Sequence, residues 1–304
     1  MKLIEKMSKE LKLNSTYLYD IANRSSYYYK DYSIPKKKGG CRNISQPSPE
    51  LKTLQYWIKD NILTKMPISK FAFAYNKGDS IKKHASIHSK SRFLFHSDIM
   101  AFFPSIHFAI LKKEFEHNRE LLNKLNLDFD DTMEYICKIC FKDDILCIGA
   151  VSSPIISNII MHDFDERLAK YCKQSRYVYS RYADDIYISS SNYIDANIKE
   201  YLKKLLLEYQ FEINNKKTYF CSSKHRRVVT GIVITNDLKL SVGLNKRKEV
   251  KKIVYNKLVK GEGDSAKILG NLAFLKDIEP HTYDKIIIKY SRYCDEDIIK
   301  ALSK

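Results

Sequence analysis

The stretch Tyr177–Ser189, YVYSRYADDIYIS, places two adjacent acids between two runs of aromatic and β-branched residues. Such runs favour pleated strands, so the stretch predicts a β-hairpin with Asp184 and Asp185 at its tip. Neighbouring carboxylates in a tight turn repel one another unless a cation lies between them. Taken alone, Tyr-x-Asp-Asp is also compatible with an ordinary polar turn, and the rest of the chain decides between the two interpretations.

The composition predicts a globular protein with a polyanionic partner. The chain has 304 residues, of which 44% are hydrophobic and 12% aromatic, so it can bury a full core. Lys and Arg total 53 against 36 Asp and Glu, which gives a net charge of +17. Such a surplus favours nucleic acid as the partner, because each phosphate contact releases counterions; a membrane surface is the weaker alternative.

The chain contains no apolar run of roughly 18 residues that could span a bilayer. Its charged N-terminus does not resemble a signal peptide, so we expect a cytoplasmic protein. Seven cysteines without an export signal indicate reduced thiols. Cys137 and Cys140 form a CxxC, but no second pair follows as a zinc site requires, which favours buried helix positions over metal ligands.

A third acid follows an apolar run upstream. Asp98 comes shortly after Phe93-Leu94-Phe95 and precedes a new segment that begins with Phe102-Phe103-Pro104. An acid at the end of a buried strand is costly unless it is paired or binds a cation. Asp98 is therefore a candidate to share an ion with Asp184 and Asp185.

Two loops are candidate phosphate sites. The segment Pro35–Ile44 predicts a β-hairpin with a Gly-Gly turn, whose cations Lys36, Lys37, Lys38 and Arg42 could hold a triphosphate or a nucleic-acid backbone. A solvated basic turn is the alternative. The loop Leu146–Pro154 precedes a predicted helix, whose N-terminus would present free N–H groups to phosphate or to a templating strand.

Apolar periodicity predicts the remaining elements. Helices are expected at residues 2–12, 15–24, 50–63, 107–127, 130–142, 155–171 and 195–209, with three more from Asn245 onward. The first of these three is strongly basic, which suggests a clamp on a nucleic-acid duplex; a solvated charged face is the alternative. A basic cluster at Lys224–Arg227 precedes a predicted strand pair at residues 228–234.

The order of these parts resembles the palm of a reverse transcriptase, with the basic hairpin similar to the fingers and the C-terminal helices to the thumb. Several motifs are most similar to bacterial retron reverse transcriptases: Arg42-Asn43-Ile44, Phe102–Ser105, Ser180–Asp185, Val229-Thr230-Gly231 and, as a partial match, His84–His88. His84 stands where that family has Asn. Without the family, His84 and His88 could also be metal ligands, although no third ligand lies near them in the sequence.

The resemblance implies an α+β right-hand polymerase fold with fingers, an antiparallel-sheet palm and a helical thumb. We expect N-terminal helices and fingers at residues 1–92, a palm at 93–235 with a helical insertion at about 107–145, and a thumb at 236–304.

The resemblance also implies site residues. Asp98, Asp184 and Asp185 would be catalytic and, with the backbone carbonyl of Ile99, would hold two Mg²⁺ ions. The residues expected at the dNTP are Lys38, Arg42, Phe103 and Gly149, with Phe103 as the steric gate against a ribose 2′-OH. The implied RNA-binding residues are His84, His88, Arg226, Arg227, Val229, Thr230 and Gly231.

The function implied by the resemblance is that of a retron RNA-directed DNA polymerase. It would copy part of a cognate structured non-coding RNA into single-stranded DNA, priming from a guanosine 2′-OH to give a branched RNA–DNA (msDNA), and would act in anti-phage defence with an effector protein. The alternatives are a non-retron bacterial reverse transcriptase and a non-catalytic RNA-binding scaffold. Ile148 stands where many reverse transcriptases have Gln, which predicts altered nucleotide handling.

Overall fold

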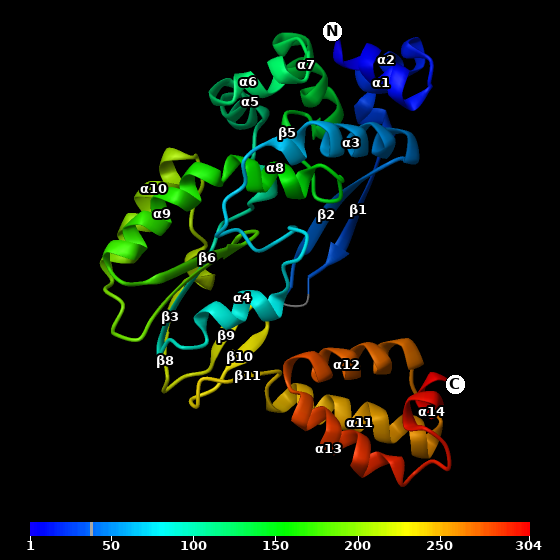
Figure 1. The fold of residues 1–304 in the computed structure, drawn as a ribbon, viewed down its shortest axis with the longest axis vertical. Coiled ribbons are helices and arrows are strands. Elements are labelled where there is room, and N and C mark those ends of the chain that lie inside the picture. The colour runs from blue at the N-terminus through cyan, green and yellow to red at the C-terminus, as the bar shows by residue number, and fades with distance from the viewer. Residues whose placement is uncertain (37–38) are drawn as a thin grey trace. The chain divides into compact units, whose positions relative to one another are not determined.

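The computed structural model describes residues 1–36 and 39–304, and Figure 1 shows the order of its elements. Lys38, a predicted dNTP ligand, lies outside the described residues. The chain forms two compact units. The first unit comprises Met1–Lys77, His96–Tyr187 and Asp195–Tyr219, and the second comprises Gly78–Phe95, Ile188–Ile194 and Phe220–Lys304.

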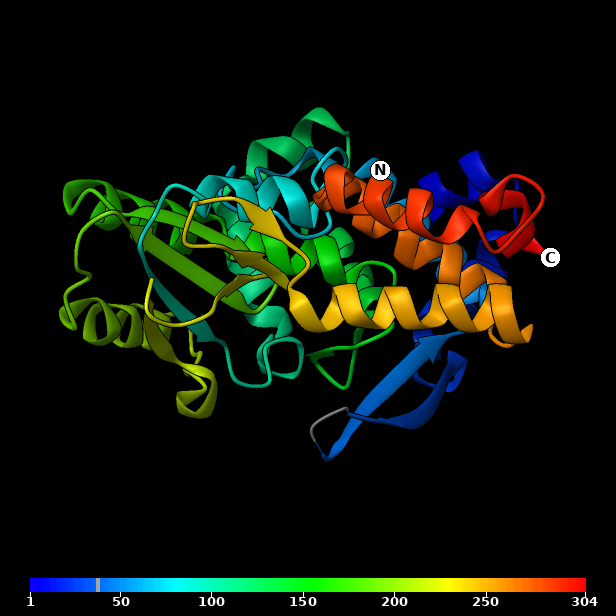
Figure 2. The same ribbon diagram turned by 90° about the horizontal axis from the view of Figure 1, so that it is seen from below.

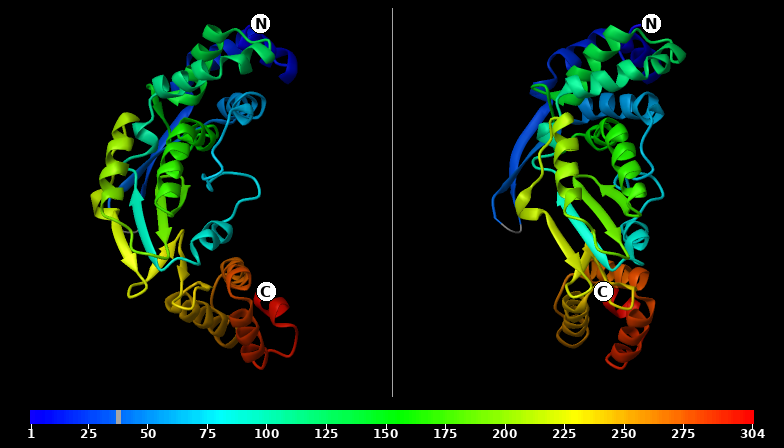
Figure 3. Two further views of the ribbon diagram at one scale, coloured as in Figure 1. Left: turned by 60° about the vertical axis from the view of Figure 1, so that its left-hand side comes forward. Right: turned by 90° about the vertical axis from the view of Figure 1, so that its left-hand side faces the viewer.

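A four-stranded sheet carries the hairpin that the sequence predicts. Its strands are β3 (Phe93–Asp98), β6 (Val178–Tyr182), β7 (Asp185–Ser190) and β8 (Tyr219–Ser222), in the order β6-β7-β3-β8 (Figure 3). The N–H groups of Arg92 and Ile99 donate to the carbonyls of Ser190 and Asp184, so β3 and β7 run antiparallel. The two central strands, β3 and β7, are buried along almost their whole length, which is why both read as apolar runs in the sequence.

Helices α8 (Ser153–Ile160), α9 (His162–Gln174) and α10 (Asn197–Glu208) belong to the first unit, and α9 packs along β6. The sequence predicted one helix over residues 155–171, but the chain leaves helical geometry at Met161. Helix α8 is buried on nearly all sides, whereas α9 buries only the stripe that contains Phe164 and Leu168. The two helices therefore have different surroundings.

The N-terminal helices of the first unit pack on one another and on a helix from later in the chain. The N-terminal helices are α1 (Leu3–Leu11), α2 (Ser15–Asn23) and α3 (Pro49–Asn61), and the later helix is α7 (Phe129–Cys140). The side chains of Asn14, Ser48 and Asp128 accept hydrogen bonds from the first-turn N–H groups of α2, α3 and α7. Cys140 is fully buried, which raises the pKa of its thiol to about 12, and Cys137 is half-buried.

The predicted Gly-Gly hairpin is longer than the sequence suggested. Strands β1 (Tyr29–Pro35) and β2 (Cys41–Pro47) pair antiparallel from Tyr29↔Pro47 to Pro35↔Cys41, and form the blue two-stranded ribbon in Figure 2. The smaller elements of this unit are α5 (Phe108–His117), α6 (Arg119–Lys124), β4 (Phe141–Lys142), β5 (Ile145–Leu146) and the 3₁₀ turns η1 (Ser25–Tyr28), η2 (Leu63–Lys65), η3 (Phe103–Ser105) and η4 (Asn215–Lys217).

The second unit contains a three-stranded sheet of order β11-β10-β9 and a set of helices. The strands are β9 (Arg227–Val229), β10 (Ile232–Ile234) and β11 (Leu240–Ser241), and α4 (Ile81–His88) packs on them. Instead of three C-terminal helices, the described residues form four: α11 (Leu244–Lys260), α12 (Ser265–Ile278), α13 (Pro280–Ser291) and α14 (Ile298–Ser303). None of the described helices is long and apolar enough to cross a bilayer.

Candidate active site

The three predicted catalytic acids lie together in the first unit. Asp98 is the last residue of β3, Asp184 lies in the turn after β6, and Asp185 is the first residue of β7. The N–H of Ile99 donates to the carbonyl oxygen of Asp184 at 2.9 Å, which fixes the end of β3 beside this turn. Two segments far apart in the sequence therefore meet at one carboxylate cluster.

The electrostatics of the cluster disfavour a bare set of three negative charges. Burial, together with the charges of Asp185 and Asp98, raises the pKa of Asp184 to about 6, although Lys217 acts in the opposite direction. Asp98 itself is only 3% exposed. Such a group of carboxylates is most stable when a cation shares it.

Asp98 is held by residues that follow the β6–β7 hairpin. Asn214 Nδ2 donates to Asp98 Oδ1 at 3.0 Å, and Lys217 Nζ lies 2.6 Å from Asp98 Oδ2. Burial lowers the pKa of Lys217, but the hydrogen bond and charge of Asp98, with the charges of Asp184 and Asp185, outweigh it and raise this pKa overall. The Lys217 ammonium therefore already places one positive charge beside the three acids.

His96 holds the third acid and was missed by the sequence analysis. Its Nε2 lies 2.8 Å from Asp185 Oδ1, and its Nδ1 lies 2.9 Å from the Lys217 carbonyl, which can only accept. The ring is packed between Tyr187 and Tyr219, with centroids at 4.8 and 5.1 Å. The available signal was its position two residues before Asp98, since side chains at i and i+2 share a face of a strand.

Carboxylate and carbonyl oxygens are the ligands that Mg²⁺ prefers, so these three acids and the Ile99 carbonyl fit a hard divalent cation chemically. Burial and the charges of Asp185 and Asp98 raise the pKa of Asp184, and a bound cation would offset this crowding of negative charge. In the structure, however, Asp98 and Asp185 are engaged by Lys217 and His96. The described part of the chain contains no group of three or more His, Cys, Asp or Glu side chains arranged as a metal site.

The predicted dNTP residues lie on neighbouring elements of the first unit. Arg42 is exposed on β2, and Phe103 is half-buried at the start of η3. Gly149 has a φ of +115°, and a Cβ there would come within 3.0 Å of Ile44 Cγ2 and the Ser45 carbonyl oxygen. Gly149 is therefore needed where the loop before α8 meets the β1–β2 hairpin.

This junction borders a cleft of about 570 Å³. The cleft is lined by residues of the β1–β2 hairpin and of the antiparallel pair β4 and β5, by the loop that contains Ile148, and by Pro104, which follows Phe103. The N–H of Ser45 donates to the Ile148 carbonyl at 2.9 Å, so the residue that replaces the usual Gln contributes its backbone to the junction.

Tyr75 is a second residue that the sequence analysis missed. It has a φ of 67° and is 54% exposed. Burial raises the pKa of its hydroxyl, as do the charges of Asp184 and Tyr182, whereas Arg42 lowers it. The charges of Asp184 and Arg42 therefore both act on Tyr75, although no acidic or basic motif marks this residue in the sequence.

The predicted RNA-binding residues meet in the second unit, although they come from two segments. His84 and His88 on α4 are fully buried. His84 Nδ1 lies 3.3 Å from Thr230 Oγ1, and His88 Nδ1 lies 2.7 Å from Ser189 Oγ. The His84–His88 segment is thus connected directly to the Val229-Thr230-Gly231 turn.

The residues of that turn and of the basic cluster differ in exposure. Gly231 and Arg226 are exposed and Thr230 is half-buried, whereas Val229 and Arg227 are buried. The Arg227 guanidinium donates to the carbonyls of Ser91 and Thr235, so it ties the hairpin to the segment after α4. The exposed positions are the ones that a bound molecule can touch directly.

Comparison with known proteins places these observations in context. Residues 34–262 match the family described as "Reverse transcriptase (RNA-dependent DNA polymerase)". The chain is 34% identical over 276 residues to "Retron Ec73 reverse transcriptase" of Escherichia coli, covering 86% of both chains. It is 32% identical over 300 residues to "Retron Ec83 reverse transcriptase" of Escherichia coli, covering 93% of this chain and 92% of that one.

Among solved structures, the chain is similar to two telomerases. It matches telomerase from Candida albicans, solved with a fragment of telomeric RNA, with a TM-score of 0.51 at 14% identity, over 91% of this chain. It matches apo telomerase from Candida tropicalis with a TM-score of 0.53 at 10% identity, over 90% of this chain. The chain spans 61% of the length of each telomerase chain, and the likeness concerns the fold alone.

Proposed function

Since this chain belongs to the reverse transcriptase family and is an RNA-directed DNA polymerase of the retron type, we propose that Asp98, Asp184 and Asp185 form its catalytic centre. The family, the right-hand polymerase fold class and the polymerase activity predicted from the sequence are confirmed by these similarities. The observation that carries the proposal is the hydrogen bond between Ile99 and Asp184, which joins the two acid-bearing segments.

In the proposed reaction, a primer hydroxyl attacks the α-phosphorus of a dNTP and pyrophosphate leaves. Two Mg²⁺ ions, held by Asp98, Asp184 and the Ile99 carbonyl with support from Asp185, would supply charge that stabilises the attacking and leaving oxygens. Asn214 and His96 orient Asp98 and Asp185. The Lys217 side chain is 59% exposed, so it can leave Asp98 and turn toward a substrate phosphate.

The nucleotide would lie against residues of the two neighbouring loops. Arg42 and Lys38 would hold the triphosphate, Gly149 would allow close approach of the backbone, and Phe103 would exclude a ribose 2′-OH. The charges of Asp184 and Arg42 shift the pKa of Tyr75 in opposite directions, which supports a triphosphate position between the hairpin and the acids.

The proposed template is a cognate structured RNA, primed from a guanosine 2′-OH to give branched RNA–DNA. Residues 1–92, 93–235 and 236–304 would act as fingers, palm and thumb, with α11 against the duplex. The turn at Val229-Thr230-Gly231, with Arg226, would contact the RNA, while the buried His84, His88 and Arg227 would support that turn from behind. A cytoplasmic location and a role in anti-phage defence with an effector protein complete the proposal.

The direct test is the double variant Asp184→Asn, Asp185→Asn, compared with Glu120→Gln on the exposed face of α6. We expect the double variant to bind RNA as well as the unchanged protein but to synthesise no cDNA, and Glu120→Gln to remain active. Continued cDNA synthesis by the double variant would contradict the proposed catalytic centre. Loss of RNA binding together with activity would instead favour a scaffold role for these acids.

A further inference from the structure

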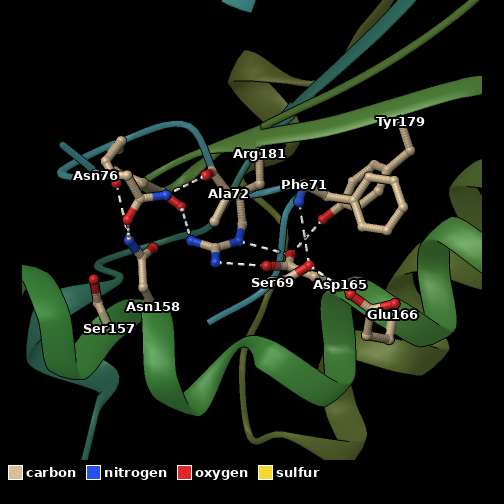
Figure 4. Close-up of polar contacts among 12 residues, drawn as sticks. Ser69, Phe71, Ala72, Asn76, Ser157, Asn158, Asp165, Glu166, Tyr179 and Arg181 are labelled. Carbon is tan, nitrogen blue, oxygen red and sulfur yellow. Dashed lines mark hydrogen bonds and ion pairs between the residues drawn. The ribbon is translucent and has the colours of Figure 1, made fainter. Parts of the chain in front are cut away.

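A fully buried ion pair lies directly behind the catalytic turn, in the first unit. Arg181 of β6 and Asp165 of α9 are both 0% exposed. The guanidinium holds the carboxylate in a two-point contact, with Nε 2.8 Å from Oδ1 and Nη2 2.7 Å from Oδ2. Tyr179 Oη also donates to Asp165 Oδ1 at 2.6 Å (Figure 4). The pair is therefore rigid and shielded from water.

The third nitrogen of the Arg181 guanidinium contacts the turn between β6 and β7. Arg181 Nη1 donates to the carbonyl oxygen of Ala183 at 3.0 Å. That carbonyl belongs to the peptide that joins Ala183 to Asp184, and Ala183 has a left-handed φ of 56°. Because an alanine adopts this conformation at a cost, the Arg181 contact helps to keep the peptide in the orientation that presents Asp184.

The same residue fixes the segment that carries Tyr75. The N–H of Arg181 donates to the Phe71 carbonyl at 2.8 Å, and the N–H of Phe73 donates to the Arg181 carbonyl at 2.9 Å. Asn158 Nδ2 then donates to the Ala74 carbonyl at 2.9 Å, immediately before Tyr75. Figure 4 shows Phe71 and Asn158 on either side of the Arg181–Asp165 pair.

Stability alone does not explain such a pair. Taking two charges out of water is costly, and replacing a buried ion pair with apolar side chains of similar volume is often neutral or stabilising. The bidentate geometry does, however, orient the guanidinium so that one N–H remains for the Ala183 carbonyl. The geometry therefore indicates a role in orientation.

We propose that Arg181, oriented by Asp165, is a positioning residue that sets the peptide between Ala183 and Asp184 and, through the 71–74 segment, the place of Tyr75. The inference rests on the proposed catalytic role of Asp184 and Asp185. It assigns no contact with substrate to Arg181 or Asp165. Their effect on the reaction passes through the turn and through the segment that leads to Tyr75.

The test replaces the pair by apolar side chains in the full-length protein. The variant Arg181→Met, Asp165→Leu, Tyr179→Phe removes both charges and the hydroxyl that would otherwise lose its acceptor. We expect a melting temperature close to that of the unchanged protein and RNA binding that is preserved. The kcat for dNTP incorporation should fall about 100-fold, the effect of a small misplacement of reacting groups, with little change in the KM for dNTP.

Two further variants separate positioning from general destabilisation. Tyr179→Phe removes a hydrogen bond to Asp165 but leaves the Ala183 contact, so it should lower the melting temperature by about 2–4 °C and leave kcat unchanged. Arg181→Lys keeps a cation beside Asp165 but lacks the planar fork, so it should lower kcat in a folded protein. If the apolar variant does not fold, Arg181→Lys decides the question.

Each remaining outcome overturns the inference. A folded apolar or Arg181→Lys variant with the kcat of the unchanged protein shows that the turn does not need Arg181. A Tyr179→Phe variant whose kcat falls as far as that of Arg181→Lys shows that lost stability explains the effect. Asp184→Asn, measured in parallel, distinguishes the two hypotheses: if it is inactive, only the inference has failed, whereas an active Asp184→Asn overturns both.

Discussion

Individual side chains at this site are held by specific polar contacts. Asp98 is held by Asn214 and Lys217, Asp185 by His96, and the peptide before Asp184 by Arg181. Asn214 and Lys217 satisfy the carboxylate of Asp98, which is buried and would be costly to leave unpaired. The acids are consequently oriented before any substrate arrives, which is the condition for electrostatic stabilisation without reorganisation.

Gly149 gives a prediction at this scale. Gly149→Ala would place a Cβ 3.0 Å from Ile44 Cγ2 and from the Ser45 carbonyl oxygen. Gly78→Ala is the matched control, because Gly78 also has a positive φ, +85°, but a Cβ there meets nothing within 4 Å. In urea unfolding we expect Gly149→Ala to lower the free energy of unfolding by about 1–3 kcal/mol more than Gly78→Ala does. Equal losses of unfolding free energy in the two variants would show that Ile44 and Ser45 can move to accommodate the added Cβ.

Among the elements, helix α4 contacts polar residues that lie far from it in the sequence. It packs on β9, β10 and β11 and presents two buried histidines, one to Thr230 and one to Ser189. Thr230 has a φ of 45°, which is unusual for a β-branched residue, and its hydroxyl contacts both His84 and the Ile81 carbonyl. The helix therefore supports the turn in a conformation that threonine does not favour on its own.

His88 makes α4 sensitive to acid. Burial, together with the charge of the neighbouring His84, lowers the pKa of His88 to about 3, whereas an unfolded histidine has a pKa near 6.5. Between these values the unfolded chain binds the extra proton, so stability is full above pH 6.5 and falls as the pH drops. We expect a loss of about 1.4 kcal/mol per pH unit from this group between pH 6 and pH 4.

Urea unfolding at several pH values checks this expectation. His88→Gln should remove the added slope, whereas His225→Gln, at an exposed position, should leave it in place. A His88→Gln protein with an undiminished slope would assign the acid sensitivity to other groups.

Helix α11 gives a second prediction at the scale of elements. Lys248, Lys251 and Lys252 are exposed on it, whereas Arg247 is engaged by Glu279 in an ion pair. If α11 contacts a duplex, changing the three lysines to Gln should reduce the slope of log binding constant against log salt by about 2–3. The matched control changes exposed lysines of α10 and α6, namely Lys203, Lys204 and Lys124, and should leave the slope unchanged. Equal effects would argue for general charge attraction.

For the whole molecule, the net charge of +17 and the similarity to retron reverse transcriptases lead to one prediction. Nucleic acid should co-purify with the active protein, and sequencing it with and without debranching should reveal a DNA strand joined to an RNA through a 2′ linkage. The Asp184→Asn, Asp185→Asn protein should carry the RNA without the DNA. RNA alone in both preparations would contradict the proposed priming reaction.

Much of the local structure was predictable because it depends on neighbours in the sequence. The runs of aromatic and β-branched residues around Asp184 predicted the β6–β7 hairpin, and most helices appear where apolar periodicity placed them. The predicted helix over residues 107–127 divides at Asn118, and the one over 155–171 divides at Met161. In addition, α4 was not expected, since only eight residues form it and most of its support comes from the sheet.

The sequence by itself determined the hairpin, its two acids, the basic surface and, through motifs, the family. It did not determine that His96 and Lys217 engage the acids, that Tyr75 lies near them, or that Arg181 and Asp165 form a buried pair behind the turn. Those contacts join residues brought together only when helices pack on the sheet, and a polar residue gives no local sign of the partner it will meet. The tertiary structure decided them, because burial makes each such partner necessary.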